Sequence, residues 1–450
     1  MAEKRMRLDD APLNKFHLKI TALTFGAHFT DAYALGIISI ALVMLTPQMH
    51  LTPIWVGLIG SSALIGIFIG SLLLGWLSDR IGRQKIFIFN FLLITVATFL
   101  QFFVHNAVEL FILRVLIGIG LGGDYTVGVT MLAEFAPRKY RGSLLGSLEV
   151  MWAVGYAGST VLGYFMQQSS PDSWRWMLVS GTIPSLIVLL MRIGTPESPR
   201  WLISKGRRQE ANQIITKHIG PNIEVDETEV QNQGGFSKLF NKNLRIRTAI
   251  GSLFFVCLVI PYFAIYTFLP SILTHMGFKE NFLTDLVLNI FLIIGAIFGI
   301  WCTDKFSRRG FLIGSFAILT VCLFLLSVLP SGSSALLITC FIIFTIVMSA
   351  VCNLTAVYTA ELFPTDVRAS GIGFVTAISR VGSAAGTFFL PTAIANFGVA
   401  YSMLGLTLVL LIGMITSIAW APETKTLTLS EASNTETDKV KSQLKDSKVL

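Results

Sequence analysis

The sequence predicts an all-α membrane protein whose twelve transmembrane helices form two six-helix bundles. Three observations lead to this fold class. The 450 residues are 53% hydrophobic and only 13% charged, whereas about a quarter of a typical soluble domain is charged. Apolar stretches of about 20 residues or more, long enough to cross a bilayer, recur along the chain. One long hydrophilic segment divides these stretches into six and six.

The distribution of basic residues predicts which side of the membrane each segment between the spans faces. With both termini in the cytoplasm, thirty of the 34 Lys and Arg residues fall in cytoplasmic segments; Arg175 and Lys279 lie toward the outer side, and Arg114 and Arg380 lie within the membrane. This agrees with the positive-inside rule, so the net charge of +8 indicates topology and not nucleic-acid binding. The spans are expected near residues 18–46, 54–78, 86–104, 108–135, 142–166, 174–192, 248–274, 284–303, 311–329, 335–361, 367–395 and 399–420.

The domains follow from these spans. We expect a cytoplasmic N-terminus (1–17), an N-terminal bundle (18–192), a cytoplasmic inter-bundle loop (193–247), a C-terminal bundle (248–420) and a disordered cytoplasmic tail (421–450). The basic lead-in is polar and runs directly into a full-length span, so it does not predict a cleavable signal peptide. The loop contains SKGRRQEANQIITKHIG, which predicts a short amphipathic helix. The tail is rich in Ser, Thr, Lys and Glu, a composition typical of disorder.

No pattern indicates an enzyme, a metal site or a cofactor. The five cysteines fall within predicted spans without ligand spacing, and we interpret them as small apolar fillers. No nucleophile–base pattern is present. The expected partners are a small-molecule substrate, protons and the lipid bilayer, not nucleic acid, and we expect a monomer.

The two halves repeat the same cytoplasmic turns. GWLSDRIGRQK follows the second span and WCTDKFSRRG the eighth; EFAPRKYRG follows the fourth and ELFPTDVRASG the tenth. Paired repeats are how many secondary transporters are built. Acidic and basic side chains on short turns can pair and cap helix ends, so we assign them to conformational gating and not to substrate contact. The gating residues are Asp79, Arg80, Gly82, Arg83, Glu134, Arg141, Asp304, Arg308, Glu361 and Arg368.

These motifs resemble the major facilitator superfamily. The second-span turn, from Gly75 to Arg83, matches its loop signature, and Arg114 with Gly118, Gly120 and Gly122 matches its fourth-helix pattern RxxxGxG. PESPRWL at 196–202 and PETK at 422–425 resemble the sugar-porter and metabolite:proton symporter branch, and GLGGDY, AEFAPR and GTPESPRW resemble metabolite transporters of the enterobacterial inner membrane. The resemblance covers the whole chain and implies alternating access in a bacterial inner membrane.

The chain also departs from branches of that superfamily. Its seventh helix, VCLVIPYFAIY, lacks the Gln-rich pattern of sugar porters and the acidic residue of phosphate symporters. Its fifth helix lacks the GPxxGG-like signature of drug exporters. These departures disfavour hexose and phosphate, and they favour uptake over efflux.

Four residues are candidates for proton coupling: Asp31, Arg114, Asp124 and His28. Asp31 is expected about 20 Å above the cytoplasmic start of helix 1, and Arg114 about 9 Å below the outer start of helix 4, in a core of about 30 Å. They are therefore expected at nearly one depth, where they can pair. In the sugar:proton symporters that the chain resembles, a helix-1 Asp and the helix-4 motif Arg form such a pair. Opening of the pair favours proton uptake; a permanent structural ion pair is the alternative.

For the other two coupling candidates, His28 and Asp124, the sequence allows two roles each. His28 lies one turn from Asp31 and either relays protons or makes a plain hydrogen bond. Asp124 is ten residues from Arg114 on a different helix face, so those two cannot pair. Asp124 corresponds to a proposed proton carrier in the resembling phosphate-symporter branch, and Tyr125 to a substrate contact there; solvation of a cavity is the alternative for Asp124.

Arg380 is the main candidate for substrate binding. It is an isolated cation near mid-membrane, which suits bidentate capture of a carboxylate, sulfonate or phosphate; pairing with Asp124, Glu149 or helix dipoles is the alternative. Glu149 shares one helix face with Trp152 and Tyr156, either as a ligand site or as a packing stripe with Glu149 turned to the vestibule. The remaining candidates, which offer hydrogen bonds, are Tyr125, Tyr262, Tyr266, Asn289 and Asn353.

Together these features predict a secondary active transporter. We expect import of a small polar metabolite, an organic anion such as a carboxylate or sugar acid, by proton symport with alternating access. One alternative is a neutral sugar or polyol transporter or facilitator. The other is a membrane sensor that binds ligand without transport.

Overall fold

The computed structural model of the chain describes residues 6–224, 239–241, 244–276, 282–329, 334–363 and 367–425. The N-terminal half contains α1 (Lys15–Gln48), α2 (Pro53–Ile81), α3 (Arg83–Leu100), η2 (Gln101–Phe103), α4 (Ala107–Phe135), α5 (Arg138–Gln167), α6 (Ser173–Ser180) and α7 (Thr182–Arg192). The C-terminal half contains α10 (Arg245–Thr267), α11 (Leu269–His275), α12 (Phe282–Lys305), α13 (Arg308–Val328), α14 (Ser334–Leu362) and α15 (Arg368–Trp420).

Polar residues and prolines set several helix starts. The Asn106 side chain accepts a hydrogen bond from the Glu109 N–H at the start of α4, and Thr52 caps α2, whose first residue is Pro53. Such caps satisfy N–H groups that have no partner inside the helix. The boundaries lie close to those expected from the apolar stretches.

Two of the expected spans are interrupted, and the last two are joined. The sixth stretch breaks at Gly181 into α6 and α7, and the seventh breaks at Phe268 into α10 and α11. The two final stretches run together as α15, which changes direction at Gly398 with a φ of 81°. Glycine adopts this left-handed backbone without steric cost.

Helix length and hydropathy agree with a membrane protein. Among the described residues, nine helices are long and apolar enough to cross a membrane. One of them covers Ser370–Trp420, a length that suffices for two crossings at about 20 residues each. Helices α4 and α5 have 29 and 30 residues but are not among the nine.

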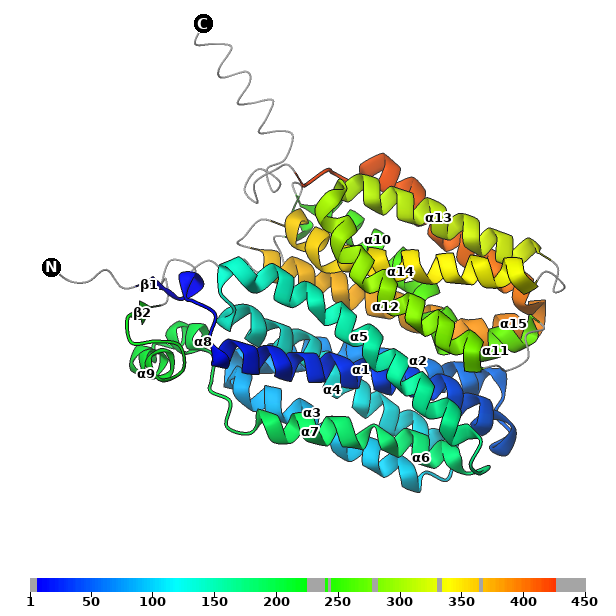
Figure 1. Cartoon of the computed structure of the whole chain (residues 1–450), viewed down its shortest axis with the longest axis horizontal. Helices are drawn as coiled ribbons and strands as arrows, with labels where there is room; N and C mark the ends of the chain where they lie inside the picture. The colour runs from blue at the N-terminus through cyan, green and yellow to red at the C-terminus, as the bar shows by residue number, and fades with distance from the viewer. Residues whose placement is uncertain are drawn as a thin grey trace, which may run out of the picture.

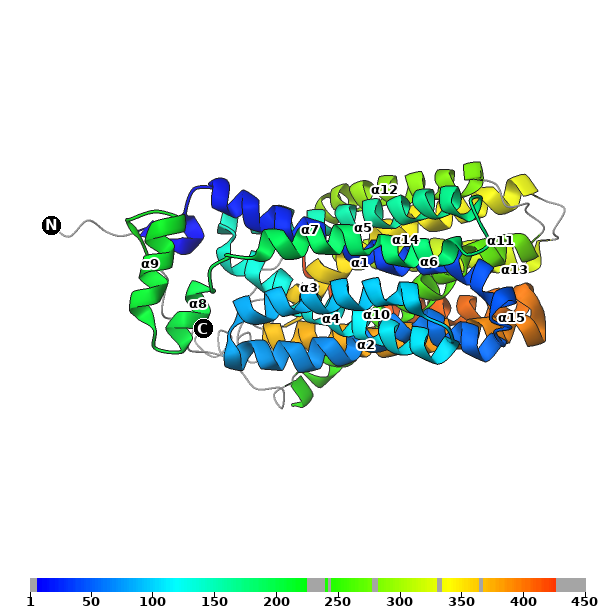
Figure 2. The same ribbon diagram turned by 90° about the horizontal axis from the view of Figure 1, so that it is seen from below.

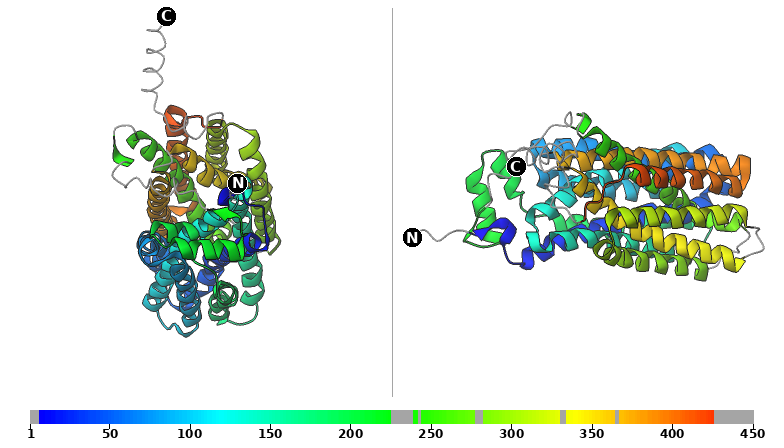
Figure 3. Two further views of the ribbon diagram at one scale, coloured as in Figure 1. Left: turned by 90° about the vertical axis from the view of Figure 1, so that its left-hand side faces the viewer. Right: turned by 90° about the horizontal axis from the view of Figure 1, so that it is seen from above.

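The two halves of the chain form two groups of helices side by side. In Figure 1, α1–α7 lie in the lower part and α10–α15 in the upper part; the end-on view in Figure 3 separates the same two groups. Within the N-terminal group, Gly118 and Gly122 of α4 lie against the backbone of Ala63 and Ile67 in α2, where a Cβ atom would overlap a carbonyl oxygen. These glycines therefore permit close packing of α4 against α2.

A small cap covers one end of the helices, which we call the terminal end; the opposite end is the distal end. The cap contains β1 (Met6–Arg7), η1 (Leu8–Asp10), α8 (Pro199–Ser204), α9 (Arg208–His218) and β2 (Ile223–Glu224). In Figure 2, α8 and α9 extend beyond the bundle helices. Helix α9 confirms the amphipathic helix expected in the inter-bundle loop, whereas the parallel pairing of β1 with β2 was not predicted.

The N-terminal segment is bound to this cap. Leu8 and Ile215 are 2% and 0% exposed and share a small apolar core. Asn14 caps α1 and donates a hydrogen bond to the His218 carbonyl at 2.9 Å, and the ring of Phe16 lies 4.7 Å from that of His218. The start of α1 is therefore anchored to the segment that follows the N-terminal bundle.

The two bundles approach closely at the distal end. A Cβ on Gly57, in the first turn of α2, would overlap the Phe388 carbonyl of α15. A Cβ on Gly60 would lie 2.7 Å from the Phe268 ring. The structure is therefore closed at the distal end.

Candidate functional site

A polar network joins three segments of the N-terminal bundle at the terminal end. Glu197, in the PESPRWL motif, accepts hydrogen bonds from the backbone N–H groups of Arg83 and Gln84 at 3.0 and 3.1 Å, so it caps α3. The Arg83 side chain pairs with Glu134 at the end of α4, and the Ser198 hydroxyl donates to the same carboxylate. A charged acceptor at a helix N-terminus satisfies free N–H groups and interacts favourably with the helix dipole.

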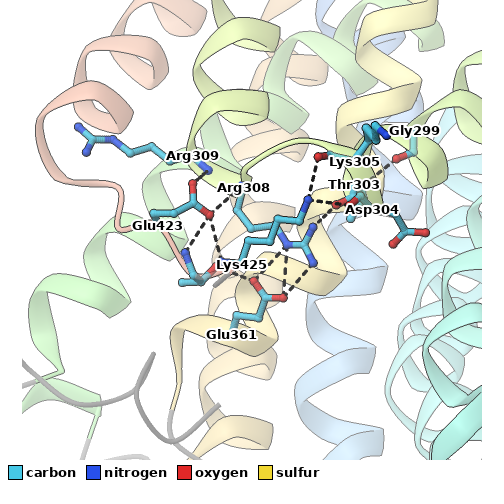
Figure 4. A network of polar contacts seen from close by, with 10 residues as sticks. Gly299, Thr303, Asp304, Lys305, Arg308, Arg309, Glu361, Glu423 and Lys425 are labelled. Atoms are coloured by element: carbon cyan, nitrogen blue, oxygen red, sulfur yellow. Dashed lines mark hydrogen bonds and ion pairs between the residues drawn. The ribbon is translucent and has the colours of Figure 1, made fainter. Parts of the chain in front are cut away.

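The C-terminal bundle repeats this network with equivalent residues. Glu423, in the PETK motif, accepts from the backbone N–H groups of Arg308 and Arg309 at 3.0 and 3.1 Å. The Arg308 side chain pairs with Glu361 at 3.2 Å, and the Thr424 hydroxyl donates to Glu361 at 2.5 Å. Figure 4 shows Glu423 and Arg308 above Glu361. Partial burial opposes ionisation, yet the N–H donors of Lys425, Arg308 and Arg309 hold the pKa of the Glu423 carboxyl below its usual value.

The networks bring together some of the gating residues and add others. Arg83 pairs with Asp79 at 3.6 Å as well as with Glu134, while Arg80 lies over the Trp76 ring at 3.9 Å. Lys425 donates to the backbone carbonyl of Asp304. The side chains of Arg141 and Arg368 lie outside the described residues. Four partners were not assigned to gating from the sequence: Glu197, Ser198, Glu423 and Thr424; their shared signal is the P-E-[ST] tripeptide that follows each bundle.

Asp31 and Arg114 do not form an ion pair in the described structure. Asp31 is 1% exposed and neither of its carboxylate oxygens has a hydrogen bond of normal geometry among the described residues. Arg114 instead reaches the Ala34 carbonyl, at 3.5 Å, one helical turn farther toward the distal end. Ala34 lies three residues beyond Asp31, about 4.5 Å along α1. Arg114 therefore contacts α1 one turn away from Asp31, although the sequence places the two charges at nearly the same depth.

Asp124 pairs with Arg192, a residue that sequence reasoning assigned to the cytoplasmic side. The Arg192 Nη1 lies 2.6 Å from the Asp124 Oδ1, and both side chains are almost completely buried. The guanidinium also lies over the rings of Phe87 and Phe91, at 3.5 and 4.1 Å, and donates to the Phe87 carbonyl. A basic residue that ends an apolar helix ordinarily points to water, but Arg192 turns inward to a carboxylate.

The coupling candidates lie near one another around Tyr125. Asp31 is within electrostatic range of Asp124, Arg192 and Arg380, and the Tyr125 hydroxyl lies close enough to interact with its carboxyl group. His28 makes a hydrogen-bond contact with the Thr24 carbonyl at 3.1 Å, and its ring lies 5.7 Å from that of Tyr125. The plain hydrogen bond considered for His28 is therefore present. A buried carboxylate without a direct partner costs several kcal/mol unless it is neutralised, a setting suited to proton uptake.

An aromatic cluster lies between the bundles. Trp152 of α5 stacks on Tyr156 with ring centroids 5.7 Å apart and lies 5.7 Å from Tyr262 of α10. Arg380 of α15 adjoins this cluster: its guanidinium carbon lies 5.0 Å from the Tyr125 ring centroid and 5.3 Å from that of Phe263. Arg380 is 7% exposed, and its Nε has no hydrogen-bond partner among the described residues.

The remaining candidates contribute unequally. Glu149 is half-buried and within electrostatic range of Arg380, but these two do not form a direct ion pair in the part of the chain that the structure describes. Tyr156 donates to the Tyr266 carbonyl at 2.7 Å, which ties α5 to α10. Asn353 donates to the Ala296 carbonyl at 3.1 Å and thereby fixes α14 to α12. Asn289 is 4% exposed.

Comparison with known proteins gives the family. The profile of the family described as "Sugar (and other) transporter" matches residues 18–435. The chain belongs to this transporter family. It is 50% identical over 430 residues, 95% of this chain and 96% of the relative, to "Inner membrane metabolite transport protein YgcS" of Escherichia coli (strain K12). It is 29% identical over 420 residues, 89% of this chain and 90% of the relative, to "Arabinose-proton symporter" of Bacillus subtilis (strain 168).

A solved structure supports the same fold. The "partially occluded inward open conformation of the xylose transporter XylE from E. coli" matches with a TM-score of 0.76 at 22% identity, covering 92% of this chain and 100% of that chain. The resemblance to the major facilitator superfamily is therefore confirmed. The protein is a multi-pass inner-membrane metabolite transporter and not an enzyme.

Proposed function

We propose that the transporter imports a small organic anion, a carboxylate or sugar acid, together with protons by alternating access. In this proposal, twelve helices cross the membrane, both termini lie in the cytoplasm, and the terminal end is the cytoplasmic end. The observation that carries the anion is Arg380: a buried guanidinium between the two bundles, whose Nε has no hydrogen-bond partner in the described part of the chain. Arginine presents a planar fork that matches a carboxylate.

Asp31 supplies the proton coupling in this proposal. Its carboxyl group is buried and has no direct ion pair among the described residues, while Arg114 of α4 contacts α1 one turn away, at the Ala34 carbonyl. Movement of α1 against α4 by one turn brings the two together and favours the ionised form; separation favours the protonated form. Asp31 thus loads and releases a proton as the bundles alternate, and the relative named as a proton symporter supports this reading.

Proton-driven accumulation tests the coupling in proteoliposomes. For Asp31→Asn we expect loss of uphill uptake and of substrate-induced proton flux, while exchange of internal for external substrate continues. Asp172→Asn is the matched control, because Asp172 is exposed at the distal end. Unchanged uphill uptake by the Asp31→Asn variant would refute the coupling role.

A neutral sugar is the second candidate substrate. It is favoured by the family description and by the relative named as an arabinose symporter. Binding measured with Arg380→Gln separates the two: an anion loses its main partner, whereas a neutral sugar binds as before.

A further inference from the structure

We propose that the substrate is a planar, conjugated carboxylate, such as an aromatic acid, whose carboxylate binds Arg380 and whose π surface lies against the aromatic cluster. The inference rests on the proposed function, because it narrows the organic anion to one chemical class. We define the cluster as Tyr125, Trp152, Tyr156, Tyr262, Phe263 and Tyr266.

The first argument is the kind of surface that the two bundles present to each other. Trp152 and Tyr156 are nearly parallel, with an interplanar angle of 14°. Tyr262 is tilted by 44° to Trp152, and Phe263 meets the same indole edge-on at 89°. Each of these four rings is at most 7% exposed. Aromatic rings gain from stacked and edge-to-face contacts with another ring beyond the burial of area, so this surface is suited to a flat π system.

The second argument is that two side-chain donors of the cluster are already used within the protein. The Trp152 indole N–H donates to the Tyr125 hydroxyl at 3.2 Å. The Tyr156 hydroxyl donates to the Tyr266 carbonyl at 2.7 Å, and the Asn353 amide donates to the Ala296 carbonyl. A polyhydroxylated substrate needs a partner for each buried hydroxyl, since an unpaired hydroxyl is costly. The donors of Trp152 and Tyr156 are therefore not free for a sugar or sugar acid, which disfavours both.

The third argument is the position of the cation. Arg380 lies against the rings of Tyr125 and Phe263, at 5.0 and 5.3 Å, and retains an unpaired Nε among the described residues. A carboxylate conjugated to a ring lies in the plane of that ring, and a bidentate guanidinium lies in the plane of the carboxylate. One flat ligand can therefore pair with Arg380 and stack on neighbouring rings at the same time. A saturated ring holds its carboxylate out of plane and cannot do both.

Isothermal titration of the purified full-length transporter with four probes tests the inference. Benzoate is planar and anionic, cyclohexanecarboxylate is anionic but puckered, benzamide is planar but neutral, and D-xylose is a neutral polyol. We expect benzoate to bind roughly tenfold more tightly than cyclohexanecarboxylate, the size of effect that one or two aromatic contacts produce, and benzamide and D-xylose to bind weakly or not at all.

Variants identify the groups responsible. Arg380→Gln should abolish binding of both acids, and Arg380→Lys should weaken it because lysine lacks the planar fork. Trp152→Leu should remove the preference for benzoate while cyclohexanecarboxylate still binds, whereas Trp152→Phe should keep the preference. Trp176→Leu is the matched control, since Trp176 is 58% exposed; retained binding there shows that loss of a tryptophan alone is harmless.

The outcomes separate the inference from the proposed function. Equal affinity for the two acids, with both lost in Arg380→Gln, would overturn the planar class and leave the organic anion in place. Binding of D-xylose alone, unaffected by Arg380→Gln, would overturn both. A preference for benzoate that survives Trp152→Leu would also overturn the inference, because the aromatic cluster would then not be its source.

Discussion

At the residue scale, Arg192 forms a buried ion pair with Asp124 inside the N-terminal bundle. Its side chain is 0% exposed and that of Asp124 is 1% exposed, with 2.6 Å between their charged atoms. Removing one member of a buried pair leaves an unpaired charge, which is far more costly than the net worth of the pair. The two phenylalanine faces around the guanidinium cannot replace the lost carboxylate.

The Arg192→Gln variant tests this directly. We expect a loss of about 3–5 kcal/mol in the free energy of unfolding, because Asp124 remains buried without its partner. The double variant Asp124→Asn with Arg192→Gln should recover most of that loss. Thermal unfolding in detergent, followed by circular dichroism, measures both, with Arg207→Gln as control because the Arg207–Glu210 pair is half exposed. Equal melting temperatures for Arg192→Gln and Arg207→Gln would contradict this role.

Residue identities could be predicted better than residue pairings. The sequence singles out Asp31, Arg114, Asp124 and Arg380 as charges that need a reason to lie in a membrane, and all four are buried. It cannot predict that Arg114 misses Asp31 by one turn, since helix tilt and rotation depend on packing against neighbours. The sequence also cannot distinguish Arg192 from a basic residue at a helix end that points to water. The two cases differ only in the direction of the side chain.

At the element scale, the turn between α2 and α3 depends on Gly82. Its φ is 114°, and a Cβ there would lie 2.5 Å from Glu197 Oε2. A side chain at this position strains the backbone and displaces the carboxylate that caps α3. The Glu197 cap and the positive φ therefore belong to one local structure.

Gly82→Ala should destabilise the transporter by about 1–3 kcal/mol, the usual cost of a strained backbone position. Gly146→Ala is the matched control, because nothing lies within 4 Å of a Cβ at Gly146 and alanine favours a helix. Melting temperatures of the two variants give the comparison. If Gly82→Ala melts like Gly146→Ala, the turn does not require glycine.

The contact between α1 and α9 has a predictable pH dependence. Partial burial, with Lys217 and Lys19 nearby, lowers the pKa of His218 below its ordinary value. The folded cap then binds a proton less readily than the unfolded segment, so the stabilisation is complete above pH of about 6.5 and declines as the pH falls below it.

Hydrogen exchange of residues 6–19, corrected for intrinsic rates, measures this effect between pH 7.5 and 5.5. We expect protection to fall at the lower pH, and His218→Gln to flatten the change. His275→Gln is the control, since His275 is exposed at the distal end. A pH dependence that persists in His218→Gln would assign it to another group.

Helix positions follow from hydropathy, but not every helix interruption does. The length of the apolar stretch predicts the boundaries of α2 and α13 within a few residues. A backbone segment that crosses lipid must form a continuous helix, because its polar groups have no water to bind. The bend at Gly398 falls between the spans expected at 367–395 and 399–420, whereas the break at Phe268 lies inside the expected seventh span. The pairing of Met6 with Ile223 joins positions more than 200 residues apart, and no local pattern indicates it.

At the scale of the whole molecule, the structure is closed at the distal end by contacts between the bundles. Gly60 of α2 packs against Phe268, and the Tyr156 hydroxyl donates to the Tyr266 carbonyl. The terminal-end networks of Glu134 and Glu361, in contrast, each lie within one bundle. The charged networks at the terminal end therefore stabilise each bundle separately. Small and aromatic residues at the distal end make the contacts between the two bundles.

Gly60→Leu should prevent distal closure, because even a Cβ would lie 2.7 Å from the Phe268 ring. We expect a single cysteine engineered on the inner face of the distal end to react faster with a membrane-impermeant maleimide, and uptake to be lost. Gly314→Leu is the control, since Gly314 is exposed and has no atom within 4 Å of its would-be Cβ. Unchanged labelling in Gly60→Leu would show that this contact does not limit closure.

Each half of the chain contains its own complete cap network. Glu197 and Glu134 belong to the chain before residue 225, and Glu423 and Glu361 to the chain after residue 244. A polypeptide cut between these points would therefore carry one complete network on each fragment. Two separately synthesised fragments should then each insert and fold, and reassemble through the distal contacts into a working split transporter.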